Sequence, residues 1–212
     1  MTLQYNKVQE LLKSRYGDGI FHTHVSMIHP KGKFQFGRKE LEEFWDVYCK
    51  SVLISNREEL DENKLICGVA EKPQHYLPVL VDIDLKVKDT EDTEFSDHLY
   101  SDTQVTRVIE IYQSVLREIV DQLCEKDLTC VVLEKPIYYL TSGESMFAKN
   151  GFHLHFPSIF LSKIDQEVHL IPRIQEKLRE SCLFENLGYE DSSAVLDKGY
   201  CTNPWLLYGS RK

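Results

Sequence analysis

The sequence predicts an α+β fold in which helices cover one face of a mostly antiparallel β-sheet. Segments of β-type composition alternate with two long amphipathic helical patterns. The 212 residues suffice for one substantial domain, and a hydrophobic fraction of 42% can fill its core. We therefore expect a single domain, with a helical and hairpin portion over residues 1–60 and the main core over residues 61–212.

The first 60 residues are predicted to form two helices with a hairpin between them. The first helix is expected over Leu3–Tyr16 and ends at a glycine-containing turn over Gly17–Gly19. The β-type residues around Pro30–Gly32 favour a hairpin or an extended arm. The second helix is expected over Arg38–Lys50, since apolar residues recur there at helical spacing. They are Leu41, Phe44, Trp45 and Tyr48.

The main core is predicted to begin with two strands and the most regular helix of the chain. The strands are expected near Leu65–Ala70 and Val79–Leu85. The helix is expected over Asp102–Glu125, with Ser101 and Gln104 as a capping box at its start. One apolar stripe must pack on a sheet or on another helix. It comprises Val105, Val108, Ile109, Tyr112, Val115, Leu116, Ile119, Val120 and Leu123.

The rest of the core is predicted to contain four strands and a helix. Three of the strands follow one another at Thr129–Leu133, Ile137–Thr141 and Gly151–Phe156. The helix is expected around Gln166–Leu183, and Pro172 would begin or kink it. The last strand is expected near Trp205–Tyr208.

The composition argues against several classes of protein. A formal charge of −9 does not suit a protein that coats DNA, so any nucleic-acid site must be local. No membrane span or secretory signal is recognisable, which predicts an intracellular protein. The five acidic residues between Asp89 and Asp97 are interpreted as a solvated loop. The cysteines lack metal-ligand spacing, so we expect no structural zinc. They are Cys49, Cys67, Cys124, Cys130, Cys182 and Cys201.

Two aspartates lie on one face of the predicted strand Val79–Leu85. Because side chains alternate along a strand, Asp82 and Asp84 point the same way, with Cα atoms roughly 6.6 Å apart. The apolar residues between and around them, Val79, Val81, Ile83 and Leu85, point into the core. Aligned carboxylates repel each other, and Mg²⁺ or Mn²⁺ would remove this conflict and could serve phosphoryl transfer. The alternative is that both aspartates simply face water.

The segment KNGFHLHFP, residues 149–157, repeats this alternation. Phe152, Leu154 and Phe156 form its apolar face. Gly151, His153 and His155 lie on the other face, where Gly151 is expected to leave space for a ligand beside His153. The histidines could bind a transition metal or donate to a phosphate, and Lys149 adds a positive charge. A purely structural role for the histidines is the alternative.

The C-terminal segment supplies a third acid. Asp197 follows two apolar residues and could complete a carboxylate triad, although a turn residue or a helix cap would look the same. The closing segment Gly209–Lys212 offers a hydroxyl group, backbone N–H groups and two cations to phosphates.

These three clusters, in this order and at these separations, resemble the signatures of archaeo-eukaryotic primases (AEPs). The resemblance covers about residues 21–212 and rests on the joint pattern. It is greatest to the primase region of primase–helicases of nucleocytoplasmic large DNA viruses, and five segments carry it: FHTHVSMIHPKGKF, VLVDIDLK, KNGFHLHFP, VLDKGY and NPWLLYGSRK. It implies an AEP fold, with an RRM-like, mostly antiparallel sheet packed by helices and an N-terminal α/β portion.

The resemblance also implies a catalytic site within the core over residues 61–212. Asp82, Asp84 and Asp197 would hold two Mg²⁺ or Mn²⁺ ions, and His153 would contact the phosphates of the incoming nucleotide. The nucleotide site would be completed by Lys149, Ser210, Arg211 and Lys212. Broader relatives often carry an arginine before the Gly-Ser element, where this chain has Trp-Leu-Leu, so the main phosphate-binding cation is open. No role is required of His155.

By this resemblance the chain is expected to be a DNA primase or primase–polymerase that uses NTPs or dNTPs on single-stranded DNA during viral replication in the host cell. Lys31, Lys33 and Arg38 are candidates for template binding. Because the chain ends directly after Lys212, we expect it to be cut from a longer polypeptide that continues into a superfamily 3 helicase.

Two alternatives of other classes remain. A rolling-circle replication endonuclease would use the His-x-His pair His153 and His155 for its metal and a tyrosine, Tyr189 or Tyr200, as nucleophile, although neither tyrosine lies in a convincing helix. A non-catalytic single-stranded-DNA-binding module would use stacking aromatic residues, Phe34 and Phe36, together with a basic arm that contains Lys31, Lys33, Arg38 and Lys39. These two aromatic residues could equally form the core of the hairpin.

Overall fold

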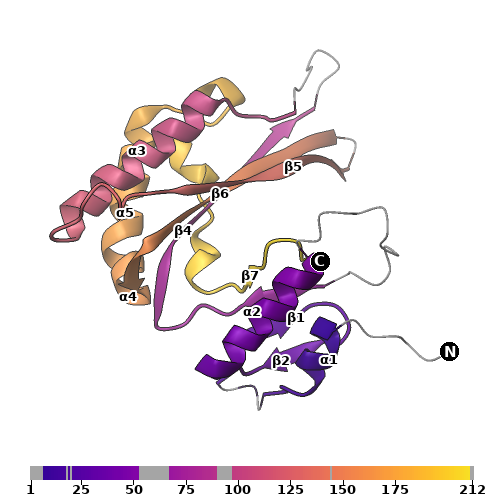
Figure 1. Cartoon of the computed structure of the whole chain (residues 1–212). Helices are drawn as coiled ribbons and strands as arrows, with labels where there is room; N and C mark the ends of the chain where they lie inside the picture. The colour runs from indigo at the N-terminus through magenta and orange to yellow at the C-terminus, as the bar shows by residue number, and fades with distance from the viewer. Residues whose placement is uncertain are drawn as a thin grey trace. The chain divides into compact units, whose positions relative to one another are not determined.

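The computed structural model describes residues 7–17, 19, 21–52, 67–89, 97–143 and 145–210. The chain divides into two compact units (Figure 1): Met1–Gln74 with Thr202–Lys212, and His75–Cys201. We expected a single domain whose N-terminal portion gives way to the core near residue 60, and that point lies outside the described residues. Each unit has a sheet of its own, where the sequence predicted one, and the strand pairs of both sheets are antiparallel, as predicted.

The first unit consists of a four-stranded sheet and two helices. The sheet order is β2-β1-β3-β7, with β1 at His24–Ser26, β2 at Gly32–Phe34, β3 at Val69–Glu71 and β7 at Trp205–Leu206. Strands β1 and β2 form the predicted hairpin. The last predicted strand therefore exists, but it is β7 of this sheet, where Leu206 pairs with Ala70.

Both predicted helices of the first unit are present. Helix α2 spans Arg38–Val52, close to the expected bounds. Helix α1 spans Lys7–Lys13 and ends before Tyr16, where we expected it to end. The chain after α1 instead extends the sheet, since Tyr16 bridges to Phe34 and the Gly17 N–H donates to the Lys33 carbonyl at 2.9 Å.

The core of the first unit contains the aromatic residues of the hairpin. Phe34 and Phe36 are 0% and 4% exposed and pack with Val8, Leu12 and Phe44. A base could not stack on rings that are buried in this way. The interpretation of these two residues as a stacking platform is therefore wrong, and their role is that of hairpin core.

A histidine is buried in the same core, which makes the stability of this unit depend on pH. His24 is 1% exposed, its ring lies 5.1 Å from the rings of Phe36 and Phe44, and its Nδ1 lies 2.9 Å from Thr23 Oγ1. Burial lowers its pKa from 6.5 to about 4. The unfolded chain therefore binds more protons between these two pH values, and stability falls as the pH falls.

We expect acidification from pH 7 to pH 5 to destabilise this unit by about 2 kcal/mol through His24 alone. His24→Gln, which cannot titrate, should show a correspondingly smaller loss. Urea unfolding followed by tryptophan fluorescence would measure this, because both tryptophans, Trp45 and Trp205, belong to this unit. Equal losses in the two proteins would show that another group is responsible.

The second unit is built on a three-stranded sheet of order β4-β6-β5. Strand β4 spans Tyr76–Lys88, β6 spans Ser145–Ser162 and β5 spans Val131–Ser142. All three are longer than predicted. The two strands expected on either side of residue 135 are one strand, β5, because an irregularity between Lys135 and Tyr138 shifts its register without ending it.

One long helix and a composite helical segment accompany this sheet. Helix α3 spans Asp102–Ile119 and begins at the predicted Ser101–Gln104 capping box. It ends before Glu125, since Val120 is extended and Gln122 takes a left-handed φ of 62° that an α-helix cannot include. The segment expected at Gln166–Leu183 is composite. It contains α4 at Lys163–Asp165, a π-helical turn at Gln166–Leu170 and α5 at Ile171–Ser181, and Pro172 lies in the first turn of α5.

Helices α3 and α5 cover one face of this sheet, as predicted (Figure 1). The face is formed by the apolar residues of β4 and β6, all 0% exposed: Val79, Val81, Ile83, Leu85, Phe152, Leu154 and Phe156. Tyr112 of α3 stacks on Phe156 with 6.1 Å between ring centroids. Three 3-10 turns follow, at Glu185–Leu187, Ser192–Val195 and Lys198–Cys201. Within the described parts of the chain, every helix is too short or too polar to span a bilayer.

Candidate metal centre

Three carboxylates meet on the second unit. Asp82 and Asp84 alternate with the buried residues of β4, so they lie on the sheet face opposite to α3 and α5. Leu196 forms an isolated antiparallel bridge with Ile83, and the Asp197 N–H donates to the Asp82 carbonyl at 2.9 Å. One carboxylate oxygen of each aspartate lies within 4.8 Å of the others. The structure thus brings together acids that are more than a hundred residues apart in the sequence.

Asp197 is held by its own turn. Its Oδ1 accepts a hydrogen bond of 2.7 Å from the N–H of Gly199, a residue of the following 3-10 turn. The expected roles of turn residue and of third acid are therefore not exclusive, since this carboxylate stabilises a turn and also faces Asp82 and Asp84.

A lysine that the sequence analysis missed lies among these carboxylates. The Lys135 ammonium donates a short hydrogen bond to Asp82 Oδ1 and a 2.6 Å hydrogen bond to Asp84 Oδ1. Its position follows from the strand register, because Lys135 of β5 and Asp84 of β4 both pair with Gly151 of the central strand β6. Lys135 was missed because it falls between two predicted strands that are one strand. Pairing β5 with β6 residue by residue could have found it.

These contacts keep the site charged. Burial on its own would raise the pKa of the Asp82 carboxyl, but hydrogen bonds and charge from His153 and Lys135 outweigh it and lower the pKa. Burial likewise opposes the charged form of Lys135, and the two carboxylates outweigh it and raise the pKa of the ammonium. The carboxylate and the ammonium therefore both remain ionised at neutral pH.

The other predicted residues of the central strand share this face. His153 pairs with Asp82 in the sheet, and its Nε2 lies 3.4 Å from Asp82 Oδ1. The Lys149 ammonium lies 4.0 Å from Asp84 Oδ2. His155 pairs with Leu80, two residues further along the strand, and burial lowers its pKa, which favours the neutral imidazole.

Gly151 has a different role from the one expected. A Cβ atom on this residue would lie 2.0 Å from the Ile83 carbonyl oxygen and 3.3 Å from Asp84 Cα. The missing side chain therefore makes room for the neighbouring strand β4. The expectation that it leaves space for a ligand beside His153 is wrong, because backbone atoms fill that space.

The donor set fits a divalent cation. Mg²⁺ and Mn²⁺ take hard oxygen ligands, and three carboxylates supply them. The three oxygen atoms lie within 4.8 Å of one another, so small side-chain rotations could bring them onto one ion. They could also bind two ions about 4 Å apart. The Lys135 ammonium shows that Asp82 and Asp84 already bind a positive charge between them. Asp82, Asp84 and Asp197 are thus the residues that could hold such ions.

The remaining predicted site residues belong to the first unit or lie outside the described residues. Ser210 is in the first unit, where its hydroxyl lies 2.9 Å from the Tyr48 hydroxyl and accepts a 3.0 Å hydrogen bond from the Val69 N–H. Arg211 and Lys212 lie outside the described residues. The three cations of the predicted template site, Lys31, Lys33 and Arg38, also belong to the first unit and are exposed.

The candidate nucleophiles of a rolling-circle nuclease are poorly placed for that chemistry. Tyr200 is 2% exposed. Tyr189 lies between two 3-10 turns, and its hydroxyl binds the backbone of Lys86 at 2.7 and 3.2 Å. Among the described residues, no group of three metal-ligand side chains includes His153 and His155.

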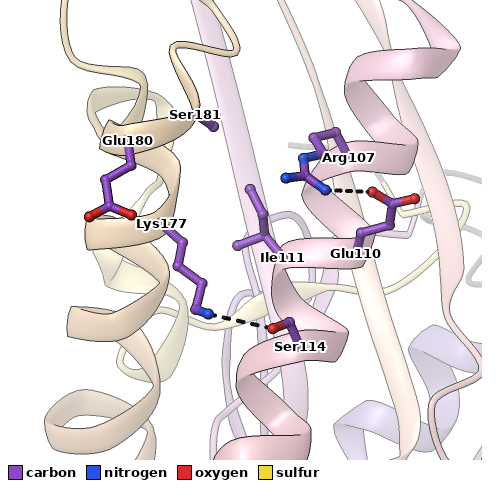
Figure 2. Close-up of a pocket in the computed structure, with 7 residues that line it drawn as sticks. All are labelled: Arg107, Glu110, Ile111, Ser114, Lys177, Glu180 and Ser181. Atoms are coloured by element: carbon purple, nitrogen blue, oxygen red, sulfur yellow. Dashed lines mark hydrogen bonds and ion pairs between the residues drawn. The ribbon is translucent and has the colours of Figure 1, made fainter.

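A pocket of this unit lies between α3 and α5, on the helical side of the sheet (Figure 2). Its cations are paired within the fold. Arg107 binds Glu110 at 2.9 Å, and Lys177 binds Glu118 at 2.8 Å and Ser114 at 3.5 Å. The carboxylate triad is the stronger candidate for a functional site, because it gathers three possible metal ligands within 4.8 Å of one another.

Comparison with known proteins gives a consistent result. The family model described as the C962R protein N-terminal AEP domain matches residues 23–212. "Putative helicase 184R" of Invertebrate iridescent virus 6 is 32% identical over 203 residues, which cover 90% of this chain and 20% of that protein. "Putative helicase 121R" of Invertebrate iridescent virus 3 is 32% identical over 201 residues, with the same two coverages. The chain thus spans about a fifth of the length of these relatives.

Proposed function

The chain belongs to the family of archaeo-eukaryotic primase (AEP) domains of the C962R type, and we propose on this basis that it is a primase or primase–polymerase. It would join nucleotides on a single-stranded DNA template, by nucleotidyl transfer, during replication of viral DNA. The observation that carries this proposal is the convergence of Asp82, Asp84 and Asp197 on one sheet face.

In this proposal the three aspartates hold two divalent ions. When bound, such ions lower the pKa of a primer 3′-hydroxyl and neutralise charge that develops on the departing pyrophosphate. No side chain has to act as a nucleophile.

Two side chains of the second unit would bind the phosphates of the incoming nucleotide. His153 would donate to a phosphate oxygen, and the Lys149 ammonium adds positive charge on the same face. Ser210, Arg211 and Lys212 are proposed to complete the nucleotide site, and the exposed cations Lys31, Lys33 and Arg38 to bind the template.

A helicase is proposed as the partner of this domain within a longer polypeptide. Both viral relatives are named as helicases, and this chain corresponds to a fifth of their length. The chain itself has no G-x-x-x-x-G-K-[ST] phosphate-binding loop. Helicase activity would therefore lie in another part of such a protein, and primer synthesis in this part.

A template-dependent incorporation assay tests the proposed function. The purified chain would be given single-stranded DNA, labelled NTPs or dNTPs, and Mg²⁺ or Mn²⁺. We expect labelled products that require both template and metal and that disappear with EDTA. The comparison of substrates and metals would also establish which nucleotide and which ion are preferred.

The same experiment separates the alternatives. A covalent protein–DNA adduct that forms in place of labelled products would favour the rolling-circle endonuclease. DNA binding that survives EDTA, without incorporation under any condition, would favour a template-holding module.

A further inference from the structure

The Lys135 ammonium occupies the position between Asp82 and Asp84, where the proposed function requires a metal ion. It is bonded to one oxygen of each carboxylate, and the side chains of Lys135 and Asp82 are only 22% and 20% exposed. An ammonium and a divalent ion cannot share the same pair of oxygen atoms, because the two cations repel each other at contact distance. Metal entry therefore requires this ammonium to leave.

Lys135 stabilises the pair of carboxylates while no metal is bound. Two carboxylates on one strand face, two residues apart, repel each other, and partial burial strengthens the repulsion. The ammonium offsets it by bonding to both. A metal ion can bind only after the contacts between the ammonium and the carboxylates are broken. This makes the net free energy of metal binding less favourable, so Lys135 weakens metal binding in the nucleotide-free protein.

The displaced ammonium stays close to the site. The backbone of Lys135 is fixed in β5, in one row of the sheet with Gly151 and Asp84, so only its flexible stem can move. The triphosphate of a metal-bound nucleotide brings several negative charges to the same place. A phosphate oxygen can then replace the carboxylates as partner of the ammonium.

We propose that Lys135 is a nucleotide-binding residue that acts as an exchangeable counter-ion: it neutralises Asp82 and Asp84 until metal ions enter, and then pairs with the triphosphate. This inference rests on the proposed function. It adds a residue that none of the three sequence clusters contains, and it makes metal binding and nucleotide binding favour each other, since the nucleotide offers the displaced ammonium a partner.

The test is a measurement of metal affinity that does not depend on primer synthesis. Titration calorimetry with Mn²⁺ would compare the wild-type chain, Lys135→Met and the control Lys177→Met. The control removes the same charge from an ion pair with Glu118 on the helical side. Without nucleotide, we expect Lys135→Met to bind Mn²⁺ about tenfold more tightly than the wild type, and the control to match the wild type.

The same titrations with a non-hydrolysable nucleoside triphosphate test the second half of the inference. The nucleotide should tighten Mn²⁺ binding more in the wild type than in Lys135→Met, by about tenfold. Lys135→Gln, which keeps a hydrogen-bonding side chain without charge, should behave in the same way and replaces the methionine variant if that variant does not fold.

The outcomes distinguish this inference from the proposed function. Equal Mn²⁺ affinity of the wild type and the Lys135 variants, without nucleotide, would overturn the role of Lys135 and leave the metal site intact. Weaker Mn²⁺ binding in the variants would also overturn it. If none of the proteins binds Mn²⁺, with or without nucleotide, both the counter-ion and the proposed metal-dependent activity are wrong.

Discussion

Replacing Asp82 and Asp84 together by asparagine is expected to lower nucleotide incorporation by at least about a thousandfold, or about 4 kcal/mol of transition-state stabilisation. The amide has nearly the same shape as the carboxylate but no charge. Two of the three proposed metal ligands thus lose the negative charge that a hard divalent cation requires. Asp197 alone cannot keep two ions in place.

The fold should survive this double substitution. Asp82 and Asp84 point away from the apolar face of β4, whose residues Val81 and Ile83 are 0% exposed and remain unchanged. Lys135 loses two neighbouring negative charges, but the amide oxygens can still accept its hydrogen bonds, and its side chain is 22% exposed, so water can reach the ammonium. We therefore expect an unchanged far-ultraviolet circular dichroism spectrum.

The incorporation assay, run beside this spectrum, checks the prediction. Asp121→Asn is a suitable control, because Asp121 is an exposed acid in the turn after α3 and the substitution makes the same chemical change. It should leave incorporation at the wild-type level. Wild-type incorporation by the folded double variant would mean that these carboxylates do not hold the catalytic metals.

Side-chain alternation made half of this site predictable. Asp82 and Asp84 alternate with buried valine and isoleucine, and His153 alternates with Phe152 and Leu154, so a period of two residues assigns each to its face. The same rule locates the core of the second unit. The apolar residues of α3 recur instead with the helical period of 3.6 residues, and the presence of both periods indicates the α+β class.

Pairing between segments far apart in the sequence was harder to predict. Asp197 reaches β4 through one backbone bridge, and only the family resemblance implied that it would. The position of Lys135 can be predicted only from the register of β5 against β6. An irregularity just after Lys135 makes this part of β5 look like a loop in the sequence. The sheet to which β7 belongs likewise depends on long-range pairing with β3. Local periodicity contains no information about partners this far apart in the sequence.

Gly151 illustrates the same limit and leads to the second large effect. A glycine in a strand indicates close approach of something, either a ligand or another backbone. The sequence could not distinguish the two. In the structure the nearest atom to a Cβ at this position is the Ile83 carbonyl oxygen, at 2.0 Å, and this atom belongs to the backbone of β4.

Gly151→Ala is therefore expected to destabilise the protein by at least about 3 kcal/mol, which is large for a single added methyl group. The clash is with backbone atoms of a paired strand, so it cannot be relieved by a change of side-chain rotamer. Strand β4 must move away from β6 or lose pairing near Ile83. Because Asp84 Cα is only 3.3 Å from the new methyl group, any such shift also displaces a proposed metal ligand.

Activity and stability should consequently fall together in Gly151→Ala. A displacement of about 1 Å at a reacting centre can lower a rate about a hundredfold, so we expect at least this loss of incorporation in the fraction that remains folded. Urea unfolding followed by circular dichroism measures the stability.

Gly17→Ala is the control, because its added Cβ would meet its nearest neighbours at 3.5 Å, an ordinary contact. A Gly151→Ala protein as stable as this control would show that β4 and β6 tolerate a side chain between them. The close approach of the two strands, on which the alignment of Asp84 with Lys135 depends, would then have to be reconsidered.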